Sequence, residues 1–250
     1  MSTLDQAQRS GPRTGVMAFI EWVTRSLAKG MLPGLVAGLI VGGVGSRLAM
    51  RIMALTSAPA ARGLETDFGA TVGEITVGGT LFLLIAGSIL GMAGGILYLA
   101  IRGLLPGSWW LKGLVFGLLL LALAGRVLVD PGNPDFVILS PAGLAVTMFA
   151  ALPILYGLLF VPLQRFLEPK IAGVRRPALF IVPVAAALLP LVLLGGLGLI
   201  VIAGSVLVWV LMNSIGEREK RLLRQAGYAF VVGLAVWRGA VFVSGVTKIL

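Results

Sequence analysis

The stretch GMLPGLVAGLIVGGVGSRLAMR, residues 30–51, decides the fold of this chain. Glycine recurs at positions 30, 34, 38 and 42, and a serine follows at 46. Residues four apart lie on one face of a helix, and glycine on that face lets a neighbouring backbone approach closely. The pattern therefore predicts a membrane-spanning helix that packs against another helix through its glycines.

The composition of the whole chain agrees with a membrane location. The 250 residues are 58% hydrophobic and 12% charged, with a mean hydropathy of +1.03. A soluble domain of similar length has about 25% charged residues. Several apolar runs also exceed the roughly 18 residues that a membrane-spanning helix needs. We therefore expect an all-α integral membrane protein.

The apolar runs predict a seven-transmembrane-helix bundle with glycine-mediated helix packing. A single helix over residues 178–214 would measure about 55 Å, whereas the hydrocarbon core of a bilayer is about 30 Å thick. We therefore expect two helices there, joined by a turn at the sequence Gly-Gly-Leu-Gly, residues 195–198. The seven predicted spans are residues 31–56, 76–101, 110–129, 139–165, 178–195, 197–214 and 225–247.

The distribution of charge predicts the orientation of the bundle, with the N-terminus inside and the C-terminus outside. Seven spans place 14 of the 20 lysines and arginines in inner segments, as the positive-inside rule requires. The net charge of +10 then indicates anionic lipids at the inner face as partners, and not nucleic acid. An excess of arginine over lysine and abundant glycine favour a multi-pass protein of a prokaryotic cytoplasmic (inner) membrane.

Residues 1–14 are polar, and we expect them to be disordered. Residues 15–30 have the spacing of an amphipathic helix that lies in the membrane interface. Residues 31–250 would then form the transmembrane domain.

Two segments of the transmembrane domain resemble each other. GLVAGLIVGGVGSRLAM at 34–50 aligns without a gap on GLVFGLLLLALAGRVLV at 113–129, and this alignment matches Arg47 with Arg126. The helix that follows each segment carries Ile-Leu-Tyr, at 96–98 and at 154–156. One interpretation is a duplicated helical hairpin, 31–103 and 110–167. The other is chance similarity between segments of low complexity.

Four arginines interrupt the predicted spans and are the candidate ligand-binding residues. Three of them lie about 20 Å along the axis from the inner end of their helices, so they share a depth in the outer half. Cations at this depth are costly in lipid and should face protein, water or a ligand. Guanidinium groups bind carboxylate or phosphate through paired hydrogen bonds. The three are Arg47, Arg126 and Arg238, and Arg51 follows Arg47 by one helical turn.

The carboxylates that would pair with these arginines all lie on the predicted outer side. In one interpretation, bonds from arginine to carboxylates and carbonyls tie the outer loops to the helices. In the other, the arginines form an outward-facing basic pocket for an anionic solute or a lipid headgroup. The expected outer-side partners are Glu65, Asp67, Glu74 and Asp130.

The chain contains no cysteine and no histidine, so it can form no disulfide, no thiolate or imidazole metal site and no histidine base. We expect no metal site and no cofactor. Three functions stay open. The first is a transporter, channel or binding protein for an anionic small molecule or lipid headgroup. The second is a non-catalytic subunit or assembly factor of a larger membrane complex, or a homo-oligomer. The third is a lipid-processing enzyme, for which the sequence offers no nucleophile–base pair.

Overall fold

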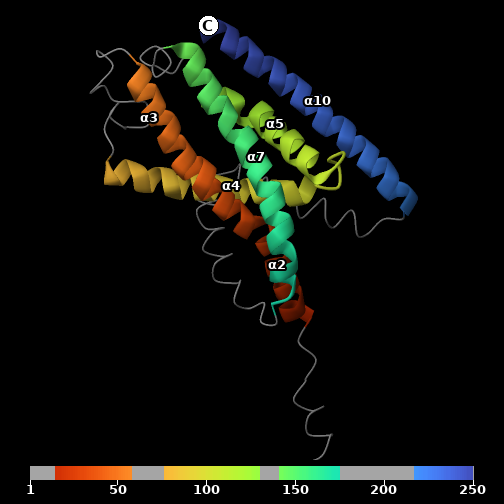
Figure 1. The fold of residues 1–250 in the computed structure, drawn as a ribbon. Coiled ribbons are helices and arrows are strands. Elements are labelled where there is room, and N and C mark those ends of the chain that lie inside the picture. The colour runs from red at the N-terminus through yellow and green to blue at the C-terminus, as the bar shows by residue number, and fades with distance from the viewer. Residues whose placement is uncertain (1–14, 58–75, 130–140, 175–216, 250) are drawn as a thin grey trace, which may run out of the picture.

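The computed structural model describes residues 15–57, 76–129, 141–174 and 217–249, and every regular element in these ranges is helical. The prediction of an all-α protein is therefore confirmed for the described residues. The predicted spans 178–195 and 197–214 lie outside these ranges, as does the segment 1–14, so the count of seven spans stays a prediction. The elements are α2 (Gly15–Ala37), η1 (Gly38–Gly45), α3 (Ser46–Thr56), α4 (Val77–Ile101), α5 (Trp109–Leu128), α7 (Ala142–Ala172) and α10 (Glu217–Ile249) (Figure 1).

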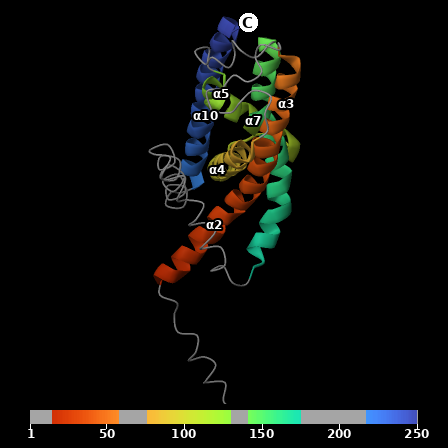
Figure 2. The same ribbon diagram turned by 90° about the vertical axis from the view of Figure 1, so that its left-hand side faces the viewer.

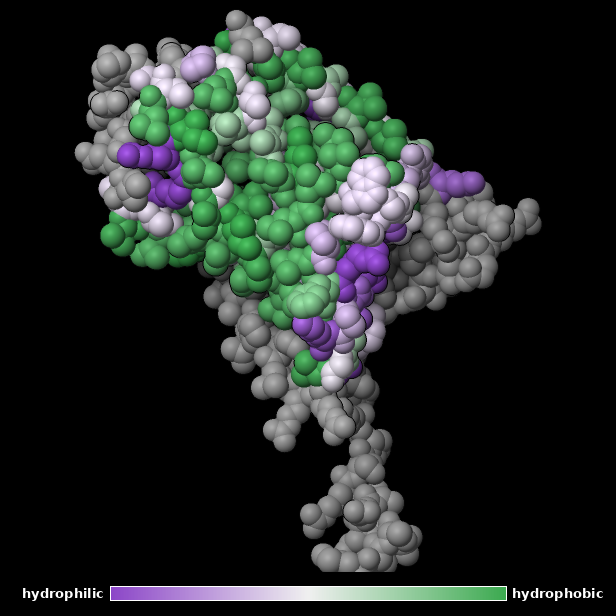
Figure 3. All heavy atoms as spheres, in the orientation of Figure 1, coloured by the Kyte–Doolittle hydropathy of each residue, from purple (hydrophilic) through white to green (hydrophobic). Residues whose placement is uncertain are grey.

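The length and composition of these helices are those of a membrane-embedded protein. Within the described ranges, four helical stretches are long and apolar enough to cross a bilayer, and Trp109–Gly125 of α5 is a shorter apolar helix. Figure 3 shows a broad apolar face over α3, α4 and α7, with hydrophilic side chains gathered at its edges. Such a face is expected where a protein contacts lipid. The four stretches are Trp22–Thr56, Val77–Ile101, Ala142–Ala172 and Val232–Ile249.

The predicted interfacial helix and the first predicted span form one continuous helical rod. α2 runs on through Gly30, η1 is a π-helical segment, and α3 continues to Thr56. The residues flanking η1, Ala37 and Ser46, have φ angles of −64° and −63°, so the backbone stays helical through both junctions. The helix thus has no break at residue 30, and the interfacial position of residues 15–30 stays a prediction.

α4 lies steeply across α2 and η1 (Figures 1 and 2). Where the two helices meet, their chains run in opposite senses, because successive glycines of the rod face earlier and earlier glycines of α4. A Cβ atom added to Gly34 would collide with the carbonyl oxygen of Gly91, and one added to Gly38 would collide with that of Gly87. In the wider π-helical turn, Gly42 and Gly43 both face α4. The two backbones are therefore in direct contact, which only glycine permits in these positions.

α5 and α7 pack against each other in the same manner. A Cβ atom on Gly117 would lie 2.7 Å from the Cα of Ile154, and one on Gly157 would lie 2.7 Å from the Cα of Gly117. Both predicted hairpins thus pair their helices through glycine, although their common origin stays a prediction. The helix ends also differ from the predicted spans: α7 continues seven residues past 165, and α10 begins at Glu217, before 225.

Aromatic side chains from α4, α5 and α7 fill the core between these pairs. The ring of Tyr98 meets those of Phe116 and Phe160 edge-on, with centroid distances of 5.1 Å in both cases. Tyr156 stacks on Phe160 at 5.5 Å, and its hydroxyl donates a 2.6 Å hydrogen bond to the carbonyl of Gly91. The tyrosines of the two Ile-Leu-Tyr sequences therefore meet in one cluster, and this cluster holds α7 against α4.

Candidate functional site

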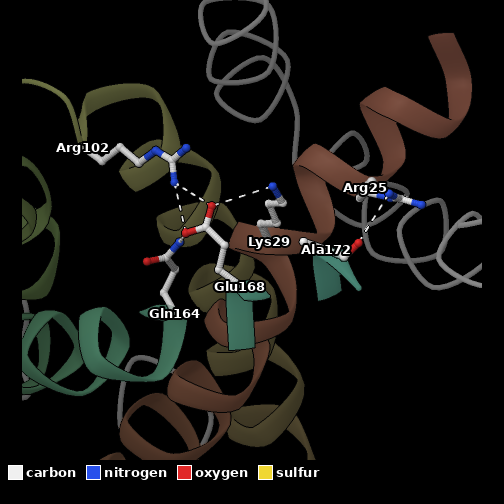
Figure 4. Close-up of polar contacts among 6 residues, drawn as sticks. All are labelled: Arg25, Lys29, Arg102, Gln164, Glu168 and Ala172. Atoms are coloured by element: carbon white, nitrogen blue, oxygen red, sulfur yellow. Dashed lines mark hydrogen bonds and ion pairs between the residues drawn. The ribbon is translucent and has the colours of Figure 1, made fainter. Parts of the chain in front are cut away.

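A carboxylate, Glu168 of α7, joins three helices at one end of the bundle (Figure 4). Its Oε1 atom lies 3.1 Å from Nη1 of Arg102, which follows α4, and 3.8 Å from Nζ of Lys29 in α2. Its Oε2 atom accepts a 2.6 Å hydrogen bond from the side-chain amide of Gln164, one helical turn away. The side chains of Arg102 and Glu168 are 46% and 29% exposed, so water still reaches this network.

The same end of α2 also contacts the C-terminal end of α7. The guanidinium of Arg25 donates to the carbonyl of Val174 over 3.1 Å. It also donates to the carbonyl of Ala172 over 3.5 Å (Figure 4). The last carbonyls of a helix have no partner within the helix and carry partial negative charge, so a cation is favourable there. Arg25 and Lys29 therefore fix the position of the α7 segment that carries Glu168.

A cavity of about 520 Å³ opens beside this network, between the end of α4, the start of α5 and the end of α7. Three cationic side chains from these three places line it: Arg102, Lys112 and Arg165. None of the described residues that line it is acidic. Its other lining residues are Tyr98, Gly103, Gly107, Ser108, Trp109, Val161 and Gln164.

The electrostatics of this cavity favour an anion. Lys112 and Arg165 make no ion pair within the described residues, whereas Arg102 is shared with Glu168. α5 begins at Trp109, so the positive end of its helix dipole also lies at the cavity. A phosphate or carboxylate here would gain contacts with two unpaired cations, and the indole of Trp109 offers an apolar wall. We call this space, with its lining residues, the basic cavity.

Two arginines of the predicted outer site, Arg47 and Arg51, lie in α3. Arg47 is half-buried, and its Nη2 atom donates a 3.3 Å hydrogen bond to the carbonyl of Thr76, the residue that caps the start of α4. Its Nε atom is buried and has no hydrogen-bond partner among the described residues. Arg51 is exposed and makes no hydrogen bond or ion pair within those residues. Arg47 therefore fastens α3 to the start of α4, and Arg51 makes no comparable contact with the described residues.

Arg238 of α10 also binds a backbone carbonyl, that of Leu123 in α5, over 2.7 Å. Arg47 and Arg238 thus contact different helices, and no described contact joins them. The side chain of Arg126 lies outside the described part of the structure, so the predicted cluster of four arginines stays a prediction. The predicted partners Glu65, Asp67, Glu74 and Asp130 also lie outside the described residues.

The sequence contained one signal for the Glu168 network. Glu168 is the only acidic residue between positions 136 and 216, and it lies one turn from Gln164 within a basic segment. An isolated carboxylate among cations indicates an ion pair, but the sequence does not show which cation it meets. The cations of the basic cavity carried no separate signal, because the positive-inside rule already accounts for each of them.

Comparison with known protein families, with curated proteins and with solved structures finds no match to this chain.

Proposed function

We propose that this chain is a multi-pass protein of a prokaryotic cytoplasmic membrane that binds an anionic small molecule or a lipid headgroup in the basic cavity. The observation that carries the proposal is the convergence of Arg102, Lys112 and Arg165 on one cavity of about 520 Å³. This volume lies within the range of about 300–1,000 Å³ that is typical of small-molecule sites. Guanidinium and ammonium groups are the side chains best suited to phosphate and carboxylate.

The proposed orientation agrees with this ligand. With seven spans, the N-terminus inside and the C-terminus outside, the basic cavity lies at the inner face of the membrane. Anionic lipids attract basic segments at that face by about 1 kcal/mol per lysine or arginine. The cavity thus lies where anionic headgroups are available, and cytosolic anions also reach it.

We further propose that Arg47 and Arg238 stabilise the helix bundle and do not bind the ligand. Each already donates a hydrogen bond to a backbone carbonyl of a neighbouring helix. A buried guanidinium needs such acceptors wherever it lies in a membrane protein. This assignment moves the ligand from the predicted outer arginines to the opposite end of α4.

Thermal unfolding of the detergent-solubilised protein tests the proposal. Inorganic phosphate and phosphatidylglycerol are titrated separately into the wild type and into a variant that combines Lys112→Gln with Arg165→Gln. We expect at least one of them to raise the Tm of the wild type and to have a much smaller effect on the variant. Lys170→Gln is the matched control, because the ammonium of Lys170 lies over the Phe166 ring and outside the cavity. Equal shifts in the wild type and the double variant would overturn the proposal.

A further inference from the structure

A second cavity, of about 480 Å³, lies between α5, α10 and the segment that joins α4 to α5. Its lining is almost wholly apolar, and the hydroxyl of Tyr228 is the one polar side-chain group among the described residues that line it. Its walls include Leu104 and Pro106 of the connecting segment, Leu118 and Ala122 of α5, and Val232 and Gly239 of α10. We call this space the apolar groove.

The connecting segment 102–108 lines both spaces. Gly103, Gly107 and Ser108 line the basic cavity, whereas Leu104, Leu105 and Pro106, which lie between them in the sequence, line the apolar groove. Gly107 has a φ angle of +83°, a conformation that glycine adopts without strain, and this allows the segment to turn sharply before α5. A charged space and an apolar space are therefore separated by a few residues of backbone.

α5 contributes to both spaces in the same way. Lys112 lines the basic cavity, and Val115, one turn further along the helix, lines the apolar groove. The two spaces share no lining residue, and they lie on either side of the segment 102–108 and the first turns of α5. A small soluble anion would use only the basic cavity and would leave this groove without an occupant.

We infer that the two spaces form one site for an anionic glycerolipid. The phosphate lies against Arg102, Lys112 and Arg165, and one acyl chain lies in the groove between α5 and α10. This inference rests on the proposed function. Of the two ligands proposed there, it selects the lipid headgroup over the anionic small molecule. The apolar lining excludes water from the chain, and the cations pair with the headgroup. The protein would then select lipids by charge and retain them by the burial of a chain.

A substitution that fills the groove tests the inference. A Cβ atom on Gly239 has no atom within 4 Å, so Gly239→Leu places its side chain in the groove without a clash with the backbone. Gly233→Leu is the matched control, because Gly233 lies in the same helix, has the same open surroundings and does not line the groove. The full-length variants are titrated in detergent with dioleoyl phosphatidylglycerol and, separately, with glycerophosphate, and their Tm values are measured.

We expect Gly239→Leu to weaken the apparent affinity for the lipid roughly tenfold, as the loss of about two buried methylene groups predicts. The response to glycerophosphate should not change, and Gly233→Leu should behave as the wild type does. An unchanged lipid response in Gly239→Leu would overturn the inference and leave the proposed function intact. If neither ligand shifts the Tm of the wild type, the proposed function fails and this inference fails with it.

Discussion

Arg102 donates from Nη1 to Oε1 of Glu168 over 3.1 Å, and this contact fastens the end of α4 to α7 beside the basic cavity. The same guanidinium lines the cavity, so Glu168 and an anion in the cavity would compete for Arg102. The stability of the bundle and the binding of the ligand are therefore linked through one side chain.

Glu168→Gln should separate these two effects. The substitution removes the ion pairs with Arg102 and Lys29, which are partly exposed, so we expect a loss of about 1 kcal/mol or less in the free energy of unfolding. The released Arg102 should also strengthen the response to phosphate. Urea unfolding in detergent measures the first effect, and the phosphate-dependent shift in Tm measures the second. A phosphate response equal to that of the wild type would show that Arg102 does not contact the anion.

Gly38→Ala should destabilise the protein, because the added Cβ atom would collide with the backbone of α4 at Gly87 and Gly91. Forcing the backbones apart in a packed core costs about 1–3 kcal/mol. Gly78→Ala is the control, since a Cβ atom there meets nothing within 4 Å. Circular dichroism during thermal unfolding compares the two variants with the wild type. Equal Tm values for Gly38→Ala and Gly78→Ala would contradict the close contact between η1 and α4.

Tyr156→Phe removes the hydroxyl that donates to the carbonyl of Gly91 and keeps the ring in its stack with Phe160. Hydrogen bonds between membrane helices contribute about 1 kcal/mol, so we expect a loss of this size in unfolding free energy. Tyr98→Phe is the comparison, because the Tyr98 hydroxyl makes no hydrogen bond to the described residues. A larger loss in Tyr98→Phe than in Tyr156→Phe would show that the bond to Gly91 does not hold α7 against α4.

The sequence was sufficient to predict where the middle helices lie. The predicted spans 76–101 and 110–129 agree within a residue with α4 and α5, because hydrophobicity and membrane thickness together fix the length of an apolar run. The end of α7 was not predicted. Charged residues after position 165 end the apolar run, but they do not end a helix, so α7 continues to Ala172.

The partners of Arg47 and the residues of the basic cavity could not be predicted from the sequence, because both depend on how the helices pack. Arg47 binds the carbonyl of Thr76, and the sequence allowed either a carboxylate or a carbonyl as its acceptor. Every residue carries a carbonyl, so composition cannot identify such an acceptor. Arg102, Lys112 and Arg165 come from three separate segments, and only the packing of α4, α5 and α7 brings them to one cavity.

The number of spans has its own test, because the chain contains no cysteine and accepts single reporter cysteines. In intact bacterial cells, Lys248→Cys should react with a membrane-impermeant maleimide added outside. Gly103→Cys should react only after the cells are permeabilised, since it lies at the predicted inner face. Protection of position 248 in intact cells would mean an even number of spans, and residues 178–214 would then cross the membrane once.

The most direct test of the central claim is native mass spectrometry of the intact protein released from detergent that contains phosphatidylglycerol. The wild type and Lys170→Gln should retain a bound lipid at collision energies that strip lipid from the combined variant Lys112→Gln and Arg165→Gln. Equal retention by all three proteins would contradict an anion site formed by the cations of α4, α5 and α7.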